Sequence, residues 1–361
     1  MKKKAIKSGK INKDVSYSSF NCFCSALGNY LCSRGVSKEN VRLALDLQWQ
    51  FFYCDVTNYS SENRIVGEYP HIYDENINMR LRLLTGYEFY KSQNKYMNLS
   101  DVDECIRKNG QAILLVNKKV VGETLKLNEF DESVTTILVK KSQQKECYEI
   151  YKPNFYGDTQ YDDSGLMTKK QLCYARFEPV REYGVCGDLI VCEKTRNIKK
   201  IDKQQLIVMM LLQVIDGYLI HNYNQINNIS KCWYGCEGMK IFSKNLLEWK
   251  KIYDKENLFN RIDFCAMGLI FVKRQRVTFF NILTDILSKT YISDDFFDEE
   301  EAKTRQEILD QWGDMRIYMR LVCFKKNTQG IDKISGYVQK LLKLECNYLK
   351  KLKACIRYKK C

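Results

Sequence analysis

The sequence predicts an α+β domain followed by an all-helical domain. In the N-terminal half, short apolar or alternating runs bounded by turn residues are interspersed with amphipathic helical segments. This pattern is typical of a mainly antiparallel sheet with helices beside it. From about Ile201 onward the strand patterns fade and helical periodicity dominates. We therefore predict a flexible basic lead over residues 1–16, an α+β domain over 17–195 and an α-helical domain over 196–361.

The elements of the α+β domain follow from apolar spacing and from turn residues. The first helix begins near Cys22 and ends at Arg34-Gly35, and the second is opened by Ser37 as its N-cap. A strand candidate follows at Phe51-Phe52-Tyr53. The remaining expected elements are helices over 75–84 and 99–106, strands over 112–116, 134–139 and 146–150, a capped helix start at 168–172 and a closing strand near 183–191.

The second half contains only helical patterns and no spanning segment. The expected helices cover residues 206–222, 238–253, 264–290, 299–324 and 331–358. The longest apolar stretch, Leu206 to Leu219, is interrupted by Gln213 and Asp216, whereas a membrane span needs about 18 apolar residues. The basic start lacks the apolar region of a secretion signal. We therefore expect a cytoplasmic protein without a membrane-spanning helix and without a membrane as a partner.

The most informative segment places Cys22 in the first turn of an apolar helix. The unpaired N–H groups and the positive dipole end of such a turn stabilise a thiolate and can hold an oxyanion. A nucleophile is therefore one interpretation of Cys22. The other interpretation is a small apolar core residue, because cysteine is among the most buried residue types.

Several motifs together resemble the butirosin-type acyltransferase family, which is described as butirosin biosynthesis protein H-like. Cys22, Ser25, Ala26, Leu27 and Gly35 match its opening helix. The segments 83–86, 99–106 and 109–116 match its next helix, glycine turn and buried strand, and residues 238–249 resemble a signature of its helical domain. The resemblance covers most of residues 17–355. It implies a papain-like cysteine-enzyme fold that moves an acyl group from an acyl-carrier-protein thioester to an amine in natural-product biosynthesis, without a cofactor.

Three positions that carry chemistry in that family differ here. Val134 stands where the family's catalytic His begins a strand, and Lys152 stands where its Asp ends the next strand. Asn21 replaces the His that precedes the nucleophile. Loss of a positioned acid–base group commonly lowers a rate by about 10²–10⁴-fold. The missing groups therefore leave three interpretations open: an acyltransferase, a catalytically degenerate pseudoenzyme kept for binding, and a cysteine peptidase or cyclase.

Other groups are candidates to replace the missing base. The chain has two histidines; His71 lies in a proline-containing connection that could fold over the site, whereas His221 lies in a helix of the second half. Asp131 and Glu132 adjoin the vacated position, although a carboxylate of ordinary pKa is a poor acceptor for a thiol proton unless burial raises its pKa. The candidate catalytic residues are therefore Cys22 and Asn21, with His71, Asp131 and Glu132 as possible substitutes for the missing base.

Sixteen cysteines raise the question of metal binding or disulfides. The closest groupings, such as Cys232 with Cys236, are not completed by the second pair of cysteines or histidines that zinc needs. We therefore expect no metal site. Scattered cysteines in a cytosolic chain are expected to be reduced and buried.

The net charge of +14 indicates an anionic partner. Basic residues gather at Lys273-Arg274 with Arg276 and over residues 350–360. An acidic acyl carrier protein, which the resemblance implies together with a small-molecule amine, fits such a surface. Nucleic acid is the weaker interpretation, because the chain has no zinc finger, RRM signature or helix-turn-helix that would support it.

Overall fold

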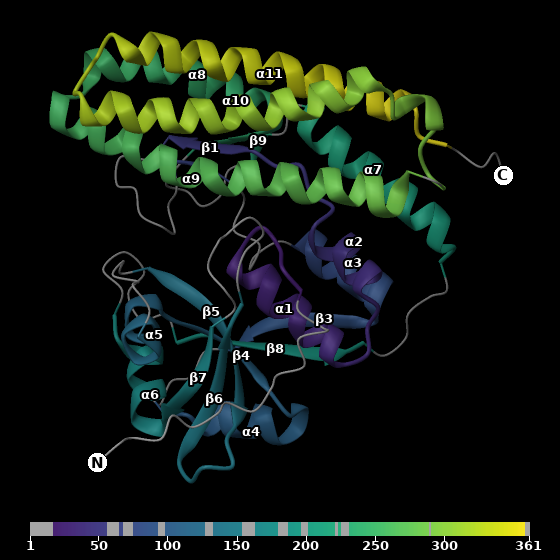
Figure 1. Cartoon of the computed structure of the whole chain (residues 1–361), viewed down its shortest axis with the longest axis vertical. Helices are drawn as coiled ribbons and strands as arrows, with labels where there is room; N and C mark the ends of the chain where they lie inside the picture. Colours follow the sequence, from purple (N-terminus) through teal and green to yellow (C-terminus); the bar gives the residue numbers. More distant parts are fainter. Residues whose placement is uncertain are drawn as a thin grey trace. The chain divides into compact units, whose positions relative to one another are not determined.

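The computed structural model forms two compact units (Figure 1). It describes residues 17–55, 65–67, 75–92, 98–126, 133–153, 163–179, 187–195, 201–220, 223–224, 231–288 and 290–357. Unit 1 comprises Met1–Leu45 and His71–Ile198, and unit 2 comprises Asp46–Pro70 and Lys199–Cys361. This division differs from the predicted one, because the described residues 46–55 and 65–67 group with unit 2 rather than with the rest of 17–195. The predicted lead over 1–16 lies outside the described residues.

Unit 1 is built on a six-stranded antiparallel sheet, as the α+β prediction requires. The strand order is β3-β8-β4-β5-β6-β7, and every neighbouring pair is antiparallel. The bounds are β3 Tyr87–Ser92, β4 Ala112–Asn117, β5 Val134–Lys141, β6 Cys147–Lys152, β7 Asp163–Thr168 and β8 Leu189–Lys194. The central strand β4 is buried at every position, which explains why its sequence is a continuous apolar run without alternation.

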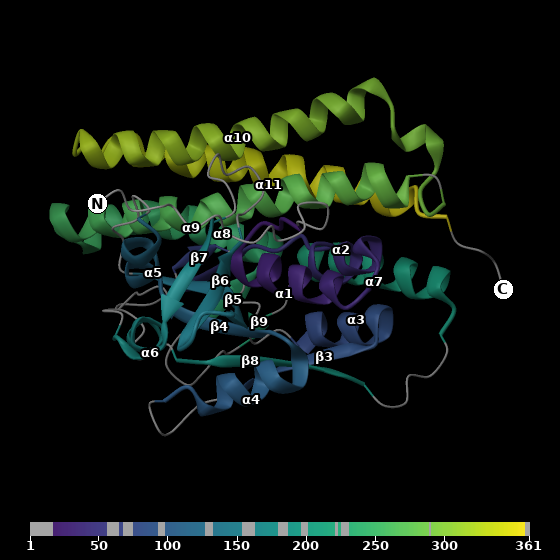
Figure 2. The same ribbon diagram turned by 60° about the horizontal axis from the view of Figure 1, so that its bottom comes forward.

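The helices of unit 1 cover both faces of this sheet. They are α1 Cys22–Ser33, α2 Lys38–Leu45, α3 Glu75–Thr85, α4 Ser100–Asn109, α5 Lys118–Leu125 and α6 Lys169–Phe177. Apolar side chains of α4, α5 and α6 share one core with Ile137, Val139, Tyr148 and Ile150 of the sheet. Helix α1 contacts β4 and β5. Figures 1 and 2 show α5 and α6 close to β7, in agreement with their contacts.

Local chemistry explains where several of these helices begin and end. Thr168 and Gln171 form a capping box at the start of α6, in which each side chain bonds the other's backbone N–H. Helix α4 ends at Gly110, whose φ of 69° lies in the left-handed region that glycine adopts without strain. Both signals are visible in the sequence, so these helix bounds lie close to the predicted ones.

Unit 2 is mainly helical but not all-helical as predicted. Its helices are α7 Lys203–Leu219, α8 Gly235–Ile252, α9 Lys255–Ile282, α10 Glu299–Phe324 and α11 Gly330–Ala354, with a π-helical turn η3 at Leu283–Leu287 and a 3₁₀ turn η4 at Asp294–Phe296. A small antiparallel sheet of order β2-β1-β10-β9 accompanies them. Its strands are β1 Phe52–Asp55, β2 Val66–Gly67, β9 Tyr223–Asn224 and β10 Lys231–Tyr234. The strand candidate at 51–53 is therefore real, but it belongs to unit 2.

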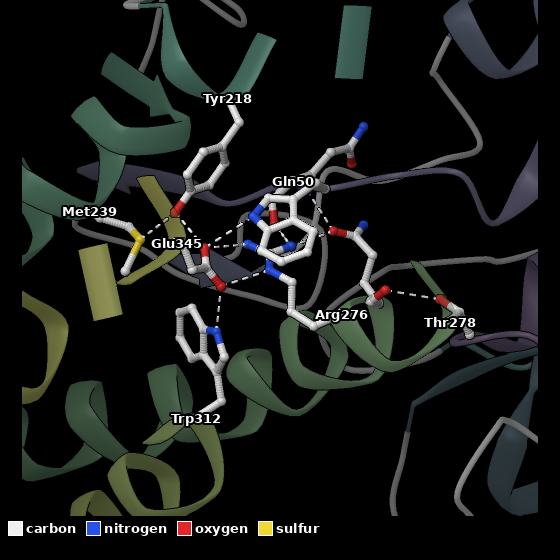
Figure 3. A network of polar contacts seen from close by, with 9 residues as sticks. Gln50, Tyr218, Met239, Arg276, Thr278, Trp312 and Glu345 are labelled. Atoms are coloured by element: carbon white, nitrogen blue, oxygen red, sulfur yellow. Dashed lines mark hydrogen bonds and ion pairs between the residues drawn. The ribbon is translucent and has the colours of Figure 1, made fainter. Parts of the chain in front are cut away.

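A buried ion pair holds the core of unit 2 together (Figure 3). The Arg276 guanidinium and the Glu345 carboxylate are fully buried, and their Nε and Oε1 atoms lie 2.8 Å apart. The indole Nε1 of Trp312 donates to Oε1 at 2.7 Å, and that of Trp49 donates to Oε2 at 3.1 Å. We expected Arg276 on the basic surface, and that expectation was wrong. A buried charge needs such a set of partners because its desolvation is costly.

The same network ties the segment 46–70 to the helices. Arg276 also donates to the backbone oxygen of Gln50 at 2.9 Å, and the Gln275 side chain accepts from the Gln50 N–H at 2.5 Å. The Tyr218 hydroxyl donates to the Glu345 carboxylate, and burial together with that carboxylate raises the pKa of Tyr218 well above its usual value. Tyr218 therefore stays protonated as a donor. The contacts of Trp49 and Gln50 explain why their segment belongs to unit 2.

A disulfide joins the two central strands of the small sheet. Cys54 of β1 is bonded to Cys232 of β10, directly opposite in the register, with their Cα atoms 4.2 Å apart. Such a separation is typical of a non-hydrogen-bonded antiparallel pair. The expectation that all cysteines are reduced was therefore wrong for this pair. No local sequence pattern predicts this pairing, since the two cysteines are separated by 178 positions.

Removing this disulfide is expected to destabilise unit 2 by about 2–4 kcal/mol, because the crosslink restricts the unfolded chain across a long loop. The measurement is denaturant unfolding followed by tryptophan fluorescence, which reports on this unit because Trp49, Trp233, Trp249 and Trp312 all belong to it. A reductant should lower the midpoint of the wild type but not that of Cys54→Ser/Cys232→Ser. An equal effect of the reductant on both proteins would contradict the prediction.

Candidate functional site

The site predicted from the sequence lies at the start of α1. Cys22 is the first residue of the helix and Asn21 is its N-cap, with the extended backbone typical of that position. The Asn21 side-chain oxygen accepts from the Cys24 backbone N–H at 2.8 Å. Asn21 thus begins the helix and positions Cys22. The side chain of Asn21 therefore serves as a helix cap.

The Cys22 thiol is free and half-buried, so it is not the fully buried core residue of the alternative interpretation. Its sulfur lies 3.6 Å from the Thr136 hydroxyl oxygen, on β5. Among the described residues we find no protein acceptor for the backbone N–H groups of Cys22 and Phe23. These two donors belong to the first turn of α1, where the helix itself offers no acceptor. They can therefore bond an oxygen atom that approaches the thiol.

Thr136 is the site residue that the sequence reasoning missed. Val134 was expected to face the thiol, but the observed contact is two residues further along the same strand. Residues two apart on a strand share a face, so Val134 and Thr136 both lie on the side of the sheet that α1 covers. The sequence gives no sign that Thr136 contacts the thiol, because a threonine in a strand pattern usually indicates β-propensity only.

Lys152 does not share that face. Leu138 of β5 lies opposite Tyr151 of β6, and residues directly opposite in an antiparallel pair share a face. Lys152, one residue further, therefore lies on the other face with Ile150, which belongs to the core beneath α4, α5 and α6. Its side chain is only 3% exposed. The position expected to hold the family's Asp is thus on the opposite side of the sheet from Thr136.

The proposed substitute bases fall outside the described part of the chain. This applies to His71, Asp131 and Glu132, and also to His221. The described residues contain no cluster of three or more His, Cys, Asp or Glu side chains that could hold a metal ion.

Three other thiols of unit 1, those of Cys32, Cys105 and Cys192, are poor nucleophiles. Burial raises the pKa of Cys192 to about 12, and it also raises the pKa of Cys32 and of Cys105. A raised pKa lowers the fraction of reactive thiolate at neutral pH. Cys105 and Cys192 are buried, whereas Cys32 is half-buried, and all three have raised pKa values. The thiol at the start of α1 is therefore the candidate for chemistry among these four.

No protein-family model matches the chain, and no curated protein matches it at a significant level. Within the described ranges, no helix is both long enough and apolar enough to cross a lipid bilayer. The cytoplasmic location stays a prediction.

Proposed function

We propose that unit 1 is a papain-like domain in which Cys22 accepts an acyl group from an acyl-carrier-protein thioester and passes it to a small-molecule amine. The observation that carries the proposal is the partly exposed thiol at the first residue of α1, beside two backbone N–H groups that have no acceptor among the described residues. The resemblance to the butirosin-type family supplies the substrate class.

The reaction consists of two acyl transfers. In the first, the Cys22 sulfur bonds the thioester carbonyl carbon, the bond from that carbon to the carrier sulfur breaks, and the carrier thiol leaves with the proton that Cys22 loses. In the second, the amine nitrogen bonds the same carbon, the bond to Cys22 breaks, and the amine proton returns to the thiol. The N–H groups of Cys22 and Phe23 stabilise the negative oxygen that forms in each step.

Thr136 supports this chemistry without acting as a base. Its hydroxyl contacts the sulfur at 3.6 Å, so it can orient the thiol, but a neutral hydroxyl is too weakly basic to take the proton. A thioester suits such a site because a thiolate is a good leaving group, whereas an amide nitrogen must be protonated before it leaves. This argument favours acyl transfer over the peptidase or cyclase interpretation.

A pseudoenzyme is the second candidate function. The specific observations in its favour are the hydroxyl of Thr136 beside the thiol and the placement of Lys152 on the other face of the sheet. On this interpretation the domain binds a carrier protein or small molecule and performs no chemistry. The two candidates differ in whether Cys22 becomes covalently acylated.

Incubation with an acyl-loaded carrier protein is expected to add the mass of the acyl group to Cys22, as read by intact-mass and peptide mass spectrometry. Cys22→Ala should abolish the adduct, because it removes the nucleophile. Thr136→Val should slow its formation by about tenfold or less, the usual effect of losing one neutral hydrogen bond.

Cys173→Ser is the matched control, since Cys173 is a half-buried thiol of α6 in the same unit, and it should leave the adduct unchanged. An adduct that persists in Cys22→Ala would overturn the proposal. No adduct on the wild type, combined with carrier binding that survives in Cys22→Ala, would establish the pseudoenzyme instead.

A further inference from the structure

One end of the helical bundle in unit 2 gathers four helix termini. The Cys323 thiol near the end of α10 donates to the backbone oxygen of Phe259, in the second turn of α9, at 3.3 Å. Lys250 near the end of α8 pairs with Asp332 in the first turn of α11 at 2.8 Å. The turn from α8 to α9 and the turn from α10 to α11 therefore lie at the same end, which is the left end of the bundle in Figure 1.

This end exposes large apolar side chains. Phe324, the last residue of α10, is 87% exposed, and Ile252, the last residue of α8, is 68% exposed. Leu321 and the 66% exposed Ile317 extend the apolar surface along α10. Leu321 follows Ile317 by four residues and Phe324 follows Leu321 by three, so the three side chains share one face of the helix. The packing of unit 2 does not account for these side chains, since α10 buries its other face.

Lysines surround the apolar residues. The exposed ones are Lys251, Lys255, Lys325 and Lys326, and within the described chain none of the four has an acidic partner. The acidic groups at this end are largely engaged: Asp254 caps α9 by accepting from the Asn257 N–H at 2.9 Å, Asp332 pairs with Lys250, and Asp263 pairs with Arg320 at 2.9 Å. The first turn of α9 also carries the exposed Glu256. The surface is therefore both apolar and positively charged.

We propose that this bundle-end surface, formed by Ile252, Phe324, Lys251, Lys255, Lys325 and Lys326, binds the surface of an anionic lipid bilayer. Apolar side chains that protrude from helix ends fit a soft interface, which closes around them without a preformed pocket. Lysines at its edge are attracted to anionic headgroups, while their alkyl stems tolerate the apolar boundary. The binding is peripheral, and the site is separate from the Cys22 site of the proposed function.

The test is a flotation assay of the full chain with phosphatidylcholine vesicles that contain or lack phosphatidylglycerol. The wild type should bind the anionic vesicles, and binding should fall at 1 M salt, where the screening length shortens to about 3 Å. Ile252→Ser/Phe324→Ser should lower the partition coefficient by about tenfold or more, because the inserted apolar area is lost. Lys325→Glu/Lys326→Glu should lower it at least as much.

Two controls match these changes at other places in unit 2. Met209→Ser removes an apolar side chain that is 65% exposed on α7. Lys303→Glu/Lys350→Glu reverses two charges at the opposite end of α10 and α11. Both controls should bind vesicles as the wild type does, and thermal melts should show that all variants are folded.

Absence of vesicle binding by the wild type would overturn the proposal, as would equal losses in the test and control variants. If the wild type ignores vesicles but Ile252→Ser/Phe324→Ser loses binding to an acidic carrier protein, the surface is a protein-docking site and the lipid assignment is wrong. None of these outcomes depends on whether Cys22 is acylated, because the assay contains no acyl donor.

Discussion

Replacing Glu345 with alanine is expected to destabilise unit 2 by about 3–5 kcal/mol, the usual effect of removing one partner of a buried ion pair. The change leaves the Arg276 charge without a counter-ion, since that guanidinium is fully buried. It also removes the acceptor of the Trp49 and Trp312 indoles and of the Tyr218 hydroxyl. Denaturant unfolding monitored by tryptophan fluorescence measures the loss.

Two further variants define the cause of this loss. The double variant Arg276→Met/Glu345→Leu should lower the free energy of unfolding by less than the sum of the losses in Arg276→Met and in Glu345→Leu, because no uncompensated charge remains buried. The exposed ion pair of Lys303 with Glu299 serves as the control, and Lys303→Ala should change the free energy of unfolding by less than about 1 kcal/mol. A loss at Glu345 no larger than this control would show that the network does not hold the core.

Replacing Gly235 with alanine is expected to destabilise the same unit by about 3 kcal/mol or more, through left-handed strain and overpacking. Gly235 is the first residue of α8, directly after β10, and its φ is 54°. A Cβ added there would lie 2.2 Å from the backbone oxygen of Tyr218. The Gly235 N–H also donates to the Phe51 backbone oxygen at 2.8 Å, so the backbone has little freedom to shift.

Gly336→Ala provides the opposite outcome in the same assay. Gly336 is exposed in the second turn of α11, and a Cβ there meets nothing within 4 Å. Alanine should therefore stabilise the helix by up to about 1 kcal/mol, since it has the higher helix propensity. If both glycine substitutions changed stability alike, the close approach of α8 to Tyr218 would not be the constraint described here.

The long helices and the main sheet could be predicted from the sequence because their signals are local. Helix α10 covers Glu299–Phe324 as its periodicity and acidic first turn predict. Strands β4, β5 and β6 lie close to the expected apolar or alternating runs. Helix α1 begins at Cys22, after an asparagine that caps it. Periodicity, caps and turn residues act over a few positions, so the chain itself carries this information.

The candidate site also has one part that local sequence predicts and one part that it does not. The sequence by itself indicated the thiol at a helix start, because residue type and helix phase suffice for that. The neighbour of the thiol required the tertiary structure: Thr136, rather than Val134, contacts Cys22, and Lys152 lies on the other face. Strand register decides both facts, and a shift by one residue exchanges the faces of a strand.

Only the tertiary structure decided the membership of the segment 46–70 and the partners of Cys54 and Arg276. Strands β2 and β9 are two residues each, too short to show a period of their own. The disulfide, the Arg276–Glu345 pair and the contact of Trp49 with Glu345 join positions far apart in the chain. Such contacts depend on how separate elements pack, and packing is a property of the folded unit that local sequence patterns do not contain.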